Sequence, residues 1–95
     1  MTVNVTSHGY PPEAVAAELL VGCRTWDDGA YVAAYDGTQA SADRIAVYAT
    51  AQMRNAWTFA RGRVELSNSS FLLRIRPIGE PLEVLVVFKG YYSAE

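Results

Sequence analysis

Apolar and polar residues alternate with period two in two segments of the last third of the chain, residues 63–66 and 71–76. This period is typical of strands that bury one face. A third segment, residues 82–92, is apolar on both faces through its middle, as a strand in the interior of a sheet would be. Turn-forming residues at positions 68–69 and 79–81 separate the three segments. The pattern therefore predicts three consecutive strands that pair in order as a meander.

A short strand and a short helix are predicted near the N-terminal end. Residues 2–7 place Val3 and Val5 on one side and polar residues on the other. Pro12 suits the first position of a helix, and residues 13–21 then put apolar side chains on one helical face. We therefore expect a helix that ends at about residue 21.

The segment that follows has two interpretations. We favour a short extended piece after the helix and then a strand at residues 30–35. In the competing interpretation, residues 20–26 form a strand that pairs with residues 30–36 through a three-residue hairpin turn at positions 27–29.

The longest predicted element is a helix at residues 42–60. Its apolar residues recur at spacings of three and four, which is typical of a helix with one buried stripe. The stripe consists of Ile45, Tyr48, Ala49, Met53, Ala56, Trp57 and Ala60. In this interpretation Trp57 and Phe88 belong to the core that joins the helix to the sheet.

These elements predict an α+β fold for a single domain of residues 1–95. The long helix packs on a mostly antiparallel sheet of about four or five strands. The sheet ends in the three-strand meander, with the last strand in its interior, and one short N-terminal helix lies beside it. A chain of 95 residues is long enough for one core and too short for a second.

Composition and charge place the chain among globular proteins without assigning it a chemistry. Hydrophobic residues make up 51% of the chain, and the net charge of −2 argues against a nucleic-acid binder that acts through bulk charge. The N-terminal residues lack the pattern of a secretory signal, and no apolar stretch approaches the roughly 20 residues that span a bilayer. We therefore expect a cytoplasmic protein with no membrane partner. Seven arginines against one lysine, with fourteen alanines, suggest a GC-rich genome of bacterial or phage origin.

No catalytic residue, cofactor or metal site is predicted. Cys23 is the only cysteine and His8 the only histidine, so the chain offers neither a conventional zinc site nor an internal disulfide. Nothing in the sequence gives Cys23 a base, and we expect it to be a small buried residue. Asp27, Asp28 and Asp36 stand just before glycines, a pattern typical of turns.

The outward face of the predicted C-terminal sheet is the candidate binding surface. Pleating would place arginines, aliphatic residues and a tyrosine together on it, a mixture that is enriched in the cores of protein interfaces. The predicted partner-binding residues are Arg63, Leu72, Arg74, Arg76, Leu85, Val87, Lys89 and Tyr91. In the competing structural interpretation, the short helix or a second copy of the chain covers this face, and Arg74 and Arg76 are rim residues that pair with Glu65 and Glu83.

Aromatic residues offer a second candidate site. Tyr48, Trp57 and Phe59 are expected in the core as part of the predicted long helix. Alternatively, Tyr31, Tyr35, Tyr48 and Trp57 line a ligand pocket between helix and sheet if the core is incomplete.

The function predicted from these features is a small non-enzymatic protein–protein binding module of the inhibitor, immunity, anti-defence or assembly-subunit type. This prediction rests on size, charge and the lack of a catalytic constellation. The apolar residues of the outward sheet face also predict a homodimer or an obligate protein partner. The alternative is a nucleic-acid or small-ligand binding domain that uses the arginine and tyrosine side chains of the same face. A small ribonuclease toxin is a further alternative, although such toxins are usually strongly basic and this chain is not.

Overall fold

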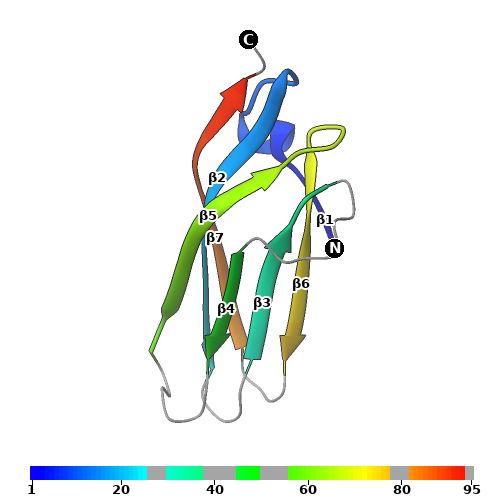
Figure 1. Cartoon of the computed structure of the whole chain (residues 1–95). Coiled ribbons are helices and arrows are strands. Elements are labelled where there is room, and N and C mark those ends of the chain that lie inside the picture. The colour runs from blue at the N-terminus through cyan, green and yellow to red at the C-terminus, as the bar shows by residue number, and fades with distance from the viewer. Residues whose placement is uncertain (26–29, 38–44, 50–55, 78–81, 94–95) are drawn as a thin grey trace.

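The computed structural model consists of two antiparallel β-sheets and describes residues 1–25, 30–37, 45–49, 56–77 and 82–93 (Figure 1). The strands are β1 (Thr2–Asn4), β2 (Ala14–Thr25), β3 (Ala30–Tyr35), β4 (Ile45–Ala49), β5 (Thr58–Glu65), β6 (Ser70–Pro77) and β7 (Leu82–Ser93), and a 3-10 helix, η1 (Val5–His8), follows β1. The α+β class predicted from the sequence is therefore wrong. No helix among the described residues is long and apolar enough to cross a membrane.

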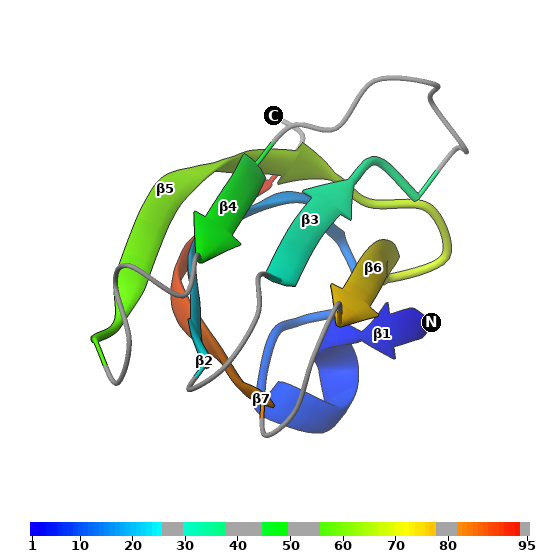
Figure 2. The ribbon, with the colours of Figure 1, turned by 90° about the horizontal axis from the view of Figure 1, so that it is seen from below.

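The strands form a four-stranded sheet in the order β1-β6-β3-β4 and a three-stranded sheet in the order β5-β2-β7. Every pair of neighbouring strands is antiparallel. A view along the strands shows the two sheets curving around a shared interior (Figure 2). The inner faces of both sheets supply the core, as in other sheet-on-sheet packings.

The long helix predicted for residues 42–60 is wrong. β4 lies inside this range, and β5 begins inside it and continues to Glu65. Residues 50–55 lie outside the described part of the chain. In β4 the buried and exposed residues alternate, with Ile45 and Ala49 inside and Tyr48 outside. Residues four apart share a face in a strand as well as in a helix. The spacing of Ile45 and Ala49 was therefore compatible with both structures.

The short helix predicted for residues 13–21 is also wrong, because β2 occupies this segment. β2 is the central strand of its sheet, and its side chains at Leu19, Val21 and Cys23 are fully buried. The competing interpretation of residues 20–26 as a strand agrees with β2 as far as Thr25. The predicted pairing of this strand with residues 30–36 is wrong. β2 pairs with β5 and with β7, whereas β3 lies in the other sheet.

The C-terminal strands exist as predicted, but the meander does not. β5 and β7 both pair with β2, while β6 joins the other sheet between β1 and β3. β7 is an edge strand within the described residues, although its sequence suggested an interior position. Alternation along a strand reports which faces are covered, and it does not report which strand is the neighbour.

The core contains fully buried residues from both sheets, the largest being Phe71 and Leu19. Phe88 packs against this core, and its ring lies 6.3 Å from that of Phe71 between centroids. Trp57 does not take the core position predicted for it. It is half-buried and stacks on Phe59 with ring centroids 5.8 Å apart, beneath the guanidinium of Arg24.

The N-terminal segment covers the corner between β1 and β7, where η1 lies in Figure 2. His8 stacks on Phe88 with ring centroids 4.5 Å apart, and Tyr10 meets the same ring edge-on at 5.6 Å. The Tyr10 hydroxyl donates to the Gly90 carbonyl oxygen at 2.6 Å and accepts from the Gly90 N–H at 3.1 Å. Both hydrogen bonds are made to the backbone of β7.

Asp36 and Gly37 form the predicted turn after β3 and attach it to the other sheet. Asp36 is buried, and its Oδ1 accepts from the backbone N–H of Glu65 at 2.9 Å. The Gly37 N–H donates to the Glu65 carbonyl oxygen at 3.0 Å. A Cβ at Gly37 would overlap the carbonyl oxygen of Ser70, so this position requires glycine for close approach.

Candidate functional site

The outer face of the four-stranded sheet gathers tyrosines and arginines from three strands. Val32 and Ala34 of β3 belong to the core, so Tyr31, Ala33 and Tyr35 take the alternate, outward positions. By the same alternation Tyr48 points outward from β4, and Leu72, Arg74 and Arg76 point outward from β6. We call Tyr31, Tyr35, Tyr48, Arg74 and Arg76 the Tyr/Arg face.

The strand register arranges this face in rows. In one row, Tyr31 lies between Tyr48 and Arg76. In the next row, Ala33 lies between Ala46 and Arg74. The methyl groups of the two alanines project little, so the rows that contain tyrosine stand higher on either side of them. In the third row, Tyr35 lies opposite Leu72.

Ring and guanidinium contacts order several of these side chains. The rings of Tyr31 and Tyr48 lie 4.8 Å apart between centroids, and the Cζ of Arg74 lies 5.0 Å from the centre of the Tyr35 ring. Such contacts are typical of cation–π pairs and of aromatic pairs on neighbouring strands. Tyr48 is nevertheless 65% exposed. The face is therefore both partly ordered and accessible.

The charge of this face has one sign. The described residues that point outward from this sheet include two arginines and no carboxylate. The chain as a whole is acidic, with a net charge of −2. The Tyr/Arg face is thus a locally positive area on an acidic protein.

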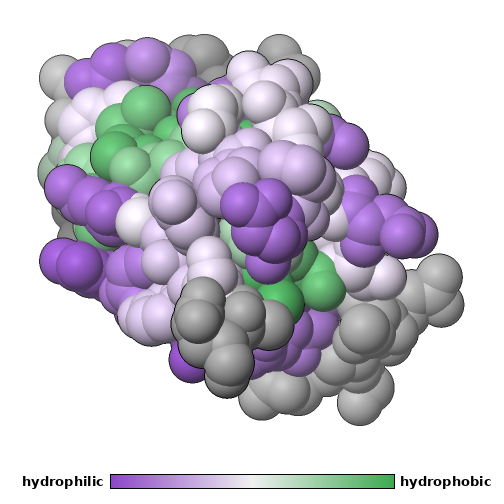
Figure 3. Space-filling view, turned by 90° about the horizontal axis from the view of Figure 1, so that it is seen from above, coloured by the Kyte–Doolittle hydropathy of each residue, from purple (hydrophilic) through white to green (hydrophobic). Residues whose placement is uncertain are grey.

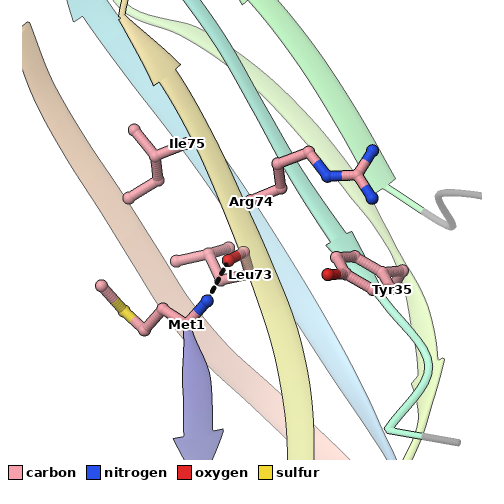
Figure 4. A pocket seen from close by; sticks show the side chains of 5 residues that line it. All are labelled: Met1, Tyr35, Leu73, Arg74 and Ile75. Atoms are coloured by element: carbon pink, nitrogen blue, oxygen red, sulfur yellow. Dashed lines mark hydrogen bonds between the residues drawn. The ribbon is translucent and has the colours of Figure 1, made fainter. Parts of the chain in front are cut away.

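A pocket of about 340 Å³ opens beside β6 at one border of this face (Figure 4). Met1, Leu73 and Ile75 lie on one side of the strand, and Arg74 and Tyr35 lie on the other. The Met1 nitrogen donates to the Leu73 carbonyl oxygen at 2.9 Å. The pocket combines one guanidinium and one phenol with apolar side chains, which suits a carboxylate that carries an apolar stem.

The predicted partner-binding residues are divided between the two sheets. Three of them, Leu72, Arg74 and Arg76, lie on the outer face of the four-stranded sheet. The other five lie on the three-stranded sheet, which consists of β5, β2 and β7, and they are Arg63, Leu85, Val87, Lys89 and Tyr91. Because the meander is absent, the structure does not bring the two groups onto one face.

The five residues of the three-stranded sheet also differ in direction. Arg63, Leu85 and Val87 follow the outward phase of their strands, opposite the buried side of β2. The register of β7 shifts between Phe88 and Gly90, so Lys89 is an extra, exposed residue. Beyond this shift Tyr91 contacts Tyr10, with ring centroids 5.2 Å apart.

Arginines on the three-stranded sheet are paired with glutamates, but these are not the pairs that the competing structural interpretation expected, since Glu65 bonds Arg63 and Glu83 bonds Arg24. The Nε of Arg61 donates to Glu18 at 2.9 Å, and the Nε of Arg63 donates to Glu65 at 3.1 Å. Tyr92 also donates to Glu18 through its hydroxyl, at 3.1 Å. The hydrogen bond from Arg61 lowers the pKa of Glu18. Two arginines of this outer face therefore have glutamate partners on the same sheet.

Sequence reasoning identified the arginines of the Tyr/Arg face and placed its tyrosines in a different site. Tyr31, Tyr35 and Tyr48 were grouped as the lining of a pocket between helix and sheet, together with Trp57. The structure brings the three tyrosines together on an outer surface, and Trp57 lies on the other sheet. The period-two alternation in β3 could have indicated that Tyr31 and Tyr35 point away from the core.

The one nucleophile candidate of the sequence, Cys23, lies in the core. Cys23 is fully buried, and burial raises the pKa of its thiol. A buried neutral thiol is a poor nucleophile, so Cys23 fits the small buried residue that the sequence predicted. Among the described residues, no group of three or more histidine, cysteine or acidic side chains is placed to hold a metal ion.

The end of the molecule that carries η1 and the β5–β6 turn shows apolar areas interrupted by polar groups (Figure 3). Comparisons of the chain with protein-family models, with curated proteins and with solved structures found no match.

Proposed function

We propose that this chain is a non-enzymatic binding module whose Tyr/Arg face binds an acidic surface of a protein partner. The observation that carries the proposal is the gathering of three tyrosines and two arginines on one exposed sheet face that has no described carboxylate. Tyrosine and arginine dominate the energetic centres of protein interfaces.

The arrangement of the face favours binding at low entropic cost. Tyrosine presents a large contact area with only two side-chain torsions to restrict. The Tyr31 and Tyr48 rings already pack together, and Arg74 already lies over Tyr35. Because these side chains are ordered before a partner arrives, less conformational freedom is lost on association.

The two arginines favour an acidic partner. A guanidinium forms paired hydrogen bonds to a carboxylate and still stacks on an aromatic ring. Arg76 is exposed beside Tyr31, and Arg74 lines the pocket with Tyr35. A glutamate or aspartate of the partner would bind Arg74 at this pocket while its neighbours pack on the tyrosine rings.

A capture experiment with matched variants tests the proposal. The tagged protein is used as bait against a bacterial lysate, and retained proteins are identified by mass spectrometry. The double change Arg74→Ala with Arg76→Ala is expected to weaken binding of the retained protein by at least about 2 kcal/mol, the usual scale of an interface hot spot. Thermal unfolding should change little, because arginines at the surface contribute little to stability.

The matched control is Arg61→Ala with Arg63→Ala, which removes two arginines spaced in the same way from the other sheet. This control is expected to retain the partner. Equal loss in both double variants would contradict a site on the Tyr/Arg face. Retention of nucleic acid by the purified protein, seen in its ratio of absorbance at 260 and 280 nm and abolished by the Arg74/Arg76 variant, would replace the protein partner with a nucleic acid.

A further inference from the structure

β7 has one edge paired with β2 and one edge that pairs with no strand in the described part of the chain. It is 12 residues long. Long, apolar, unpaired edges invite pairing with another chain, and proteins usually protect them. The hydroxyl of Tyr10 protects this edge at Gly90, where it bonds both the N–H and the carbonyl oxygen. The stretch of β7 before Gly90 has no such hydroxyl among the described hydrogen bonds.

The sequence of this stretch is complementary to itself in the antiparallel direction. Glu83 and Lys89 each lie three residues from Val86, and every residue between them is apolar. If two copies of β7 pair antiparallel about Val86, Glu83 of each copy comes close to Lys89 of the other, where β7 carries its extra residue. Both side chains are exposed, so neither needs to leave the core to make this pair.

We propose that two copies of this chain form a dimer in which their β7 edges pair antiparallel about Val86. The three-stranded sheets of the two copies then join into one continuous sheet across a two-fold axis. Backbone hydrogen bonds satisfy the unpaired edge, and the two Glu83–Lys89 pairs set the register.

The exposure of apolar side chains along β7 in one copy is consistent with a second copy pairing there. Leu85 is 42% exposed, and Val84, Val86 and Val87 are only half-buried in one copy. In the proposed register, Leu85 of each copy lies opposite Val87 of the other, so apolar side chains cover one another. The carboxylate of Glu83 is already held in place by Arg24, whose Nε donates to it at 3.1 Å.

The dimer does not depend on the proposed function. The Tyr/Arg face belongs to the four-stranded sheet, and β7 belongs to the three-stranded sheet. Each dimer would present two Tyr/Arg faces. A failure of either proposal therefore leaves the other intact.

Charge reversal at the two ends of the apolar stretch tests the register. Sedimentation equilibrium of the whole chain at about 100 μM is expected to give a dimer. In a dimer of the Lys89→Glu variant, two carboxylates meet at each end of the paired stretch. In a dimer of the Glu83→Lys variant, two ammonium groups meet there. Each single variant should dimerise about tenfold or more weakly than the wild type. A mixture of the two single variants should restore the dimer, because each reversed charge then faces its complement.

Arg76→Glu is the matched control, since it makes the same change in charge on the Tyr/Arg face and should leave dimerisation unchanged. Circular dichroism confirms that each variant keeps its strands. A wild-type monomer at this concentration would overturn the proposal, as would a mixture of the two variants that stays monomeric. If all three variants weakened dimerisation equally, the cause would be a general effect of charge, and the proposed pairing of β7 would also be overturned.

Discussion

Two glycines illustrate how the cost of an added methyl group depends on what it meets. At Gly22 a Cβ would meet the ring of Phe59, which is 48% exposed and can move outward. At Gly37 the Cβ would meet the backbone oxygen of Ser70. The backbone at Gly37 is also held by its hydrogen bond to Glu65, so it cannot shift without loss.

We therefore expect Gly37→Ala to lower the free energy of unfolding by about 1–3 kcal/mol, the cost of overpacking at a rigid position. Gly22→Ala should cost less than about 1 kcal/mol, because the Phe59 ring can rotate away and alanine loses less chain entropy than glycine on folding. Urea unfolding monitored by circular dichroism measures both. Equal costs would show that the Phe59 ring is as fixed as the backbone.

Tyr10→Phe isolates the two hydrogen bonds to Gly90, because phenylalanine keeps the ring contacts with Phe88 and Tyr91. We expect a loss of about 1 kcal/mol in the free energy of unfolding at neutral pH. Burial raises the pKa of Tyr10 in the folded protein. Its hydroxyl therefore stabilises the fold fully below the unfolded pKa, and this contribution falls as the pH rises above about 10. Tyr10→Phe should lose less stability over that alkaline range, which unfolding curves at neutral and alkaline pH would measure.

At the scale of elements, strand location was predicted better than strand pairing. The strand predicted for residues 30–35 is β3. Of the three C-terminal segments, the first overlaps the end of β5, and the other two lie within β6 and β7. Period-two alternation is a local property, so a sequence can show it. The two helices were predicted from segments whose buried residues fit both periods, such as Ile45 and Ala49 in β4. Pairing depends on distant segments, and the pairing of β6 with β1 and β3 has no local signal.

Glu18 connects all three strands of its sheet, since it lies on β2 and bonds Arg61 of β5 and Tyr92 of β7. The hydrogen bond from Arg61 lowers the pKa of Glu18 below its unfolded value. The carboxylate therefore contributes stability above the unfolded pKa, and this contribution is lost as the pH falls below about 4.

We expect Glu18→Gln to reduce the acid dependence of stability without changing the fold. The midpoint of urea unfolding, measured from about pH 6 to about pH 3, should fall less steeply with acid in the variant than in the wild type. Glu65→Gln, which loses the partner of Arg63, serves as a comparison on the same sheet. A variant with the same acid dependence as the wild type would show that Arg61 does not select the charged form of Glu18.

At the scale of the whole molecule, the two outer faces differ in the described ionisable side chains that they carry. Arginines of the three-stranded sheet bond glutamates on the same face, whereas the Tyr/Arg face has no described carboxylate. The sequence predicted two members of the Tyr/Arg face, Arg74 and Arg76, and also Leu72, which points outward from the same sheet. It did not place them beside the tyrosines, because that neighbourhood arises from the pairing of β6 with β3 and of β3 with β4.

The single shared core predicts that both sheets unfold together. Phe71 of the four-stranded sheet is fully buried and faces Phe88 of the three-stranded sheet. Phe71→Ala should lower the free energy of unfolding by about 3–5 kcal/mol. Tryptophan fluorescence and the circular dichroism of the whole chain should still report one transition with the same midpoint. Two separate midpoints would show that the sheets are independent units.

The order of strands has a consequence for how the chain acquires its structure during synthesis. Among the described strands, β1 comes first in the chain and pairs with β6, and β2 pairs with β7, which comes after all the others. Neither sheet can be completed while the C-terminal third is still inside the ribosome. Pairings between segments so distant in sequence also close slowly, because large loops lose much chain entropy. Both sheets therefore stay open until β6 and β7 have emerged, and until then the earlier apolar strands are exposed to pairing with other chains.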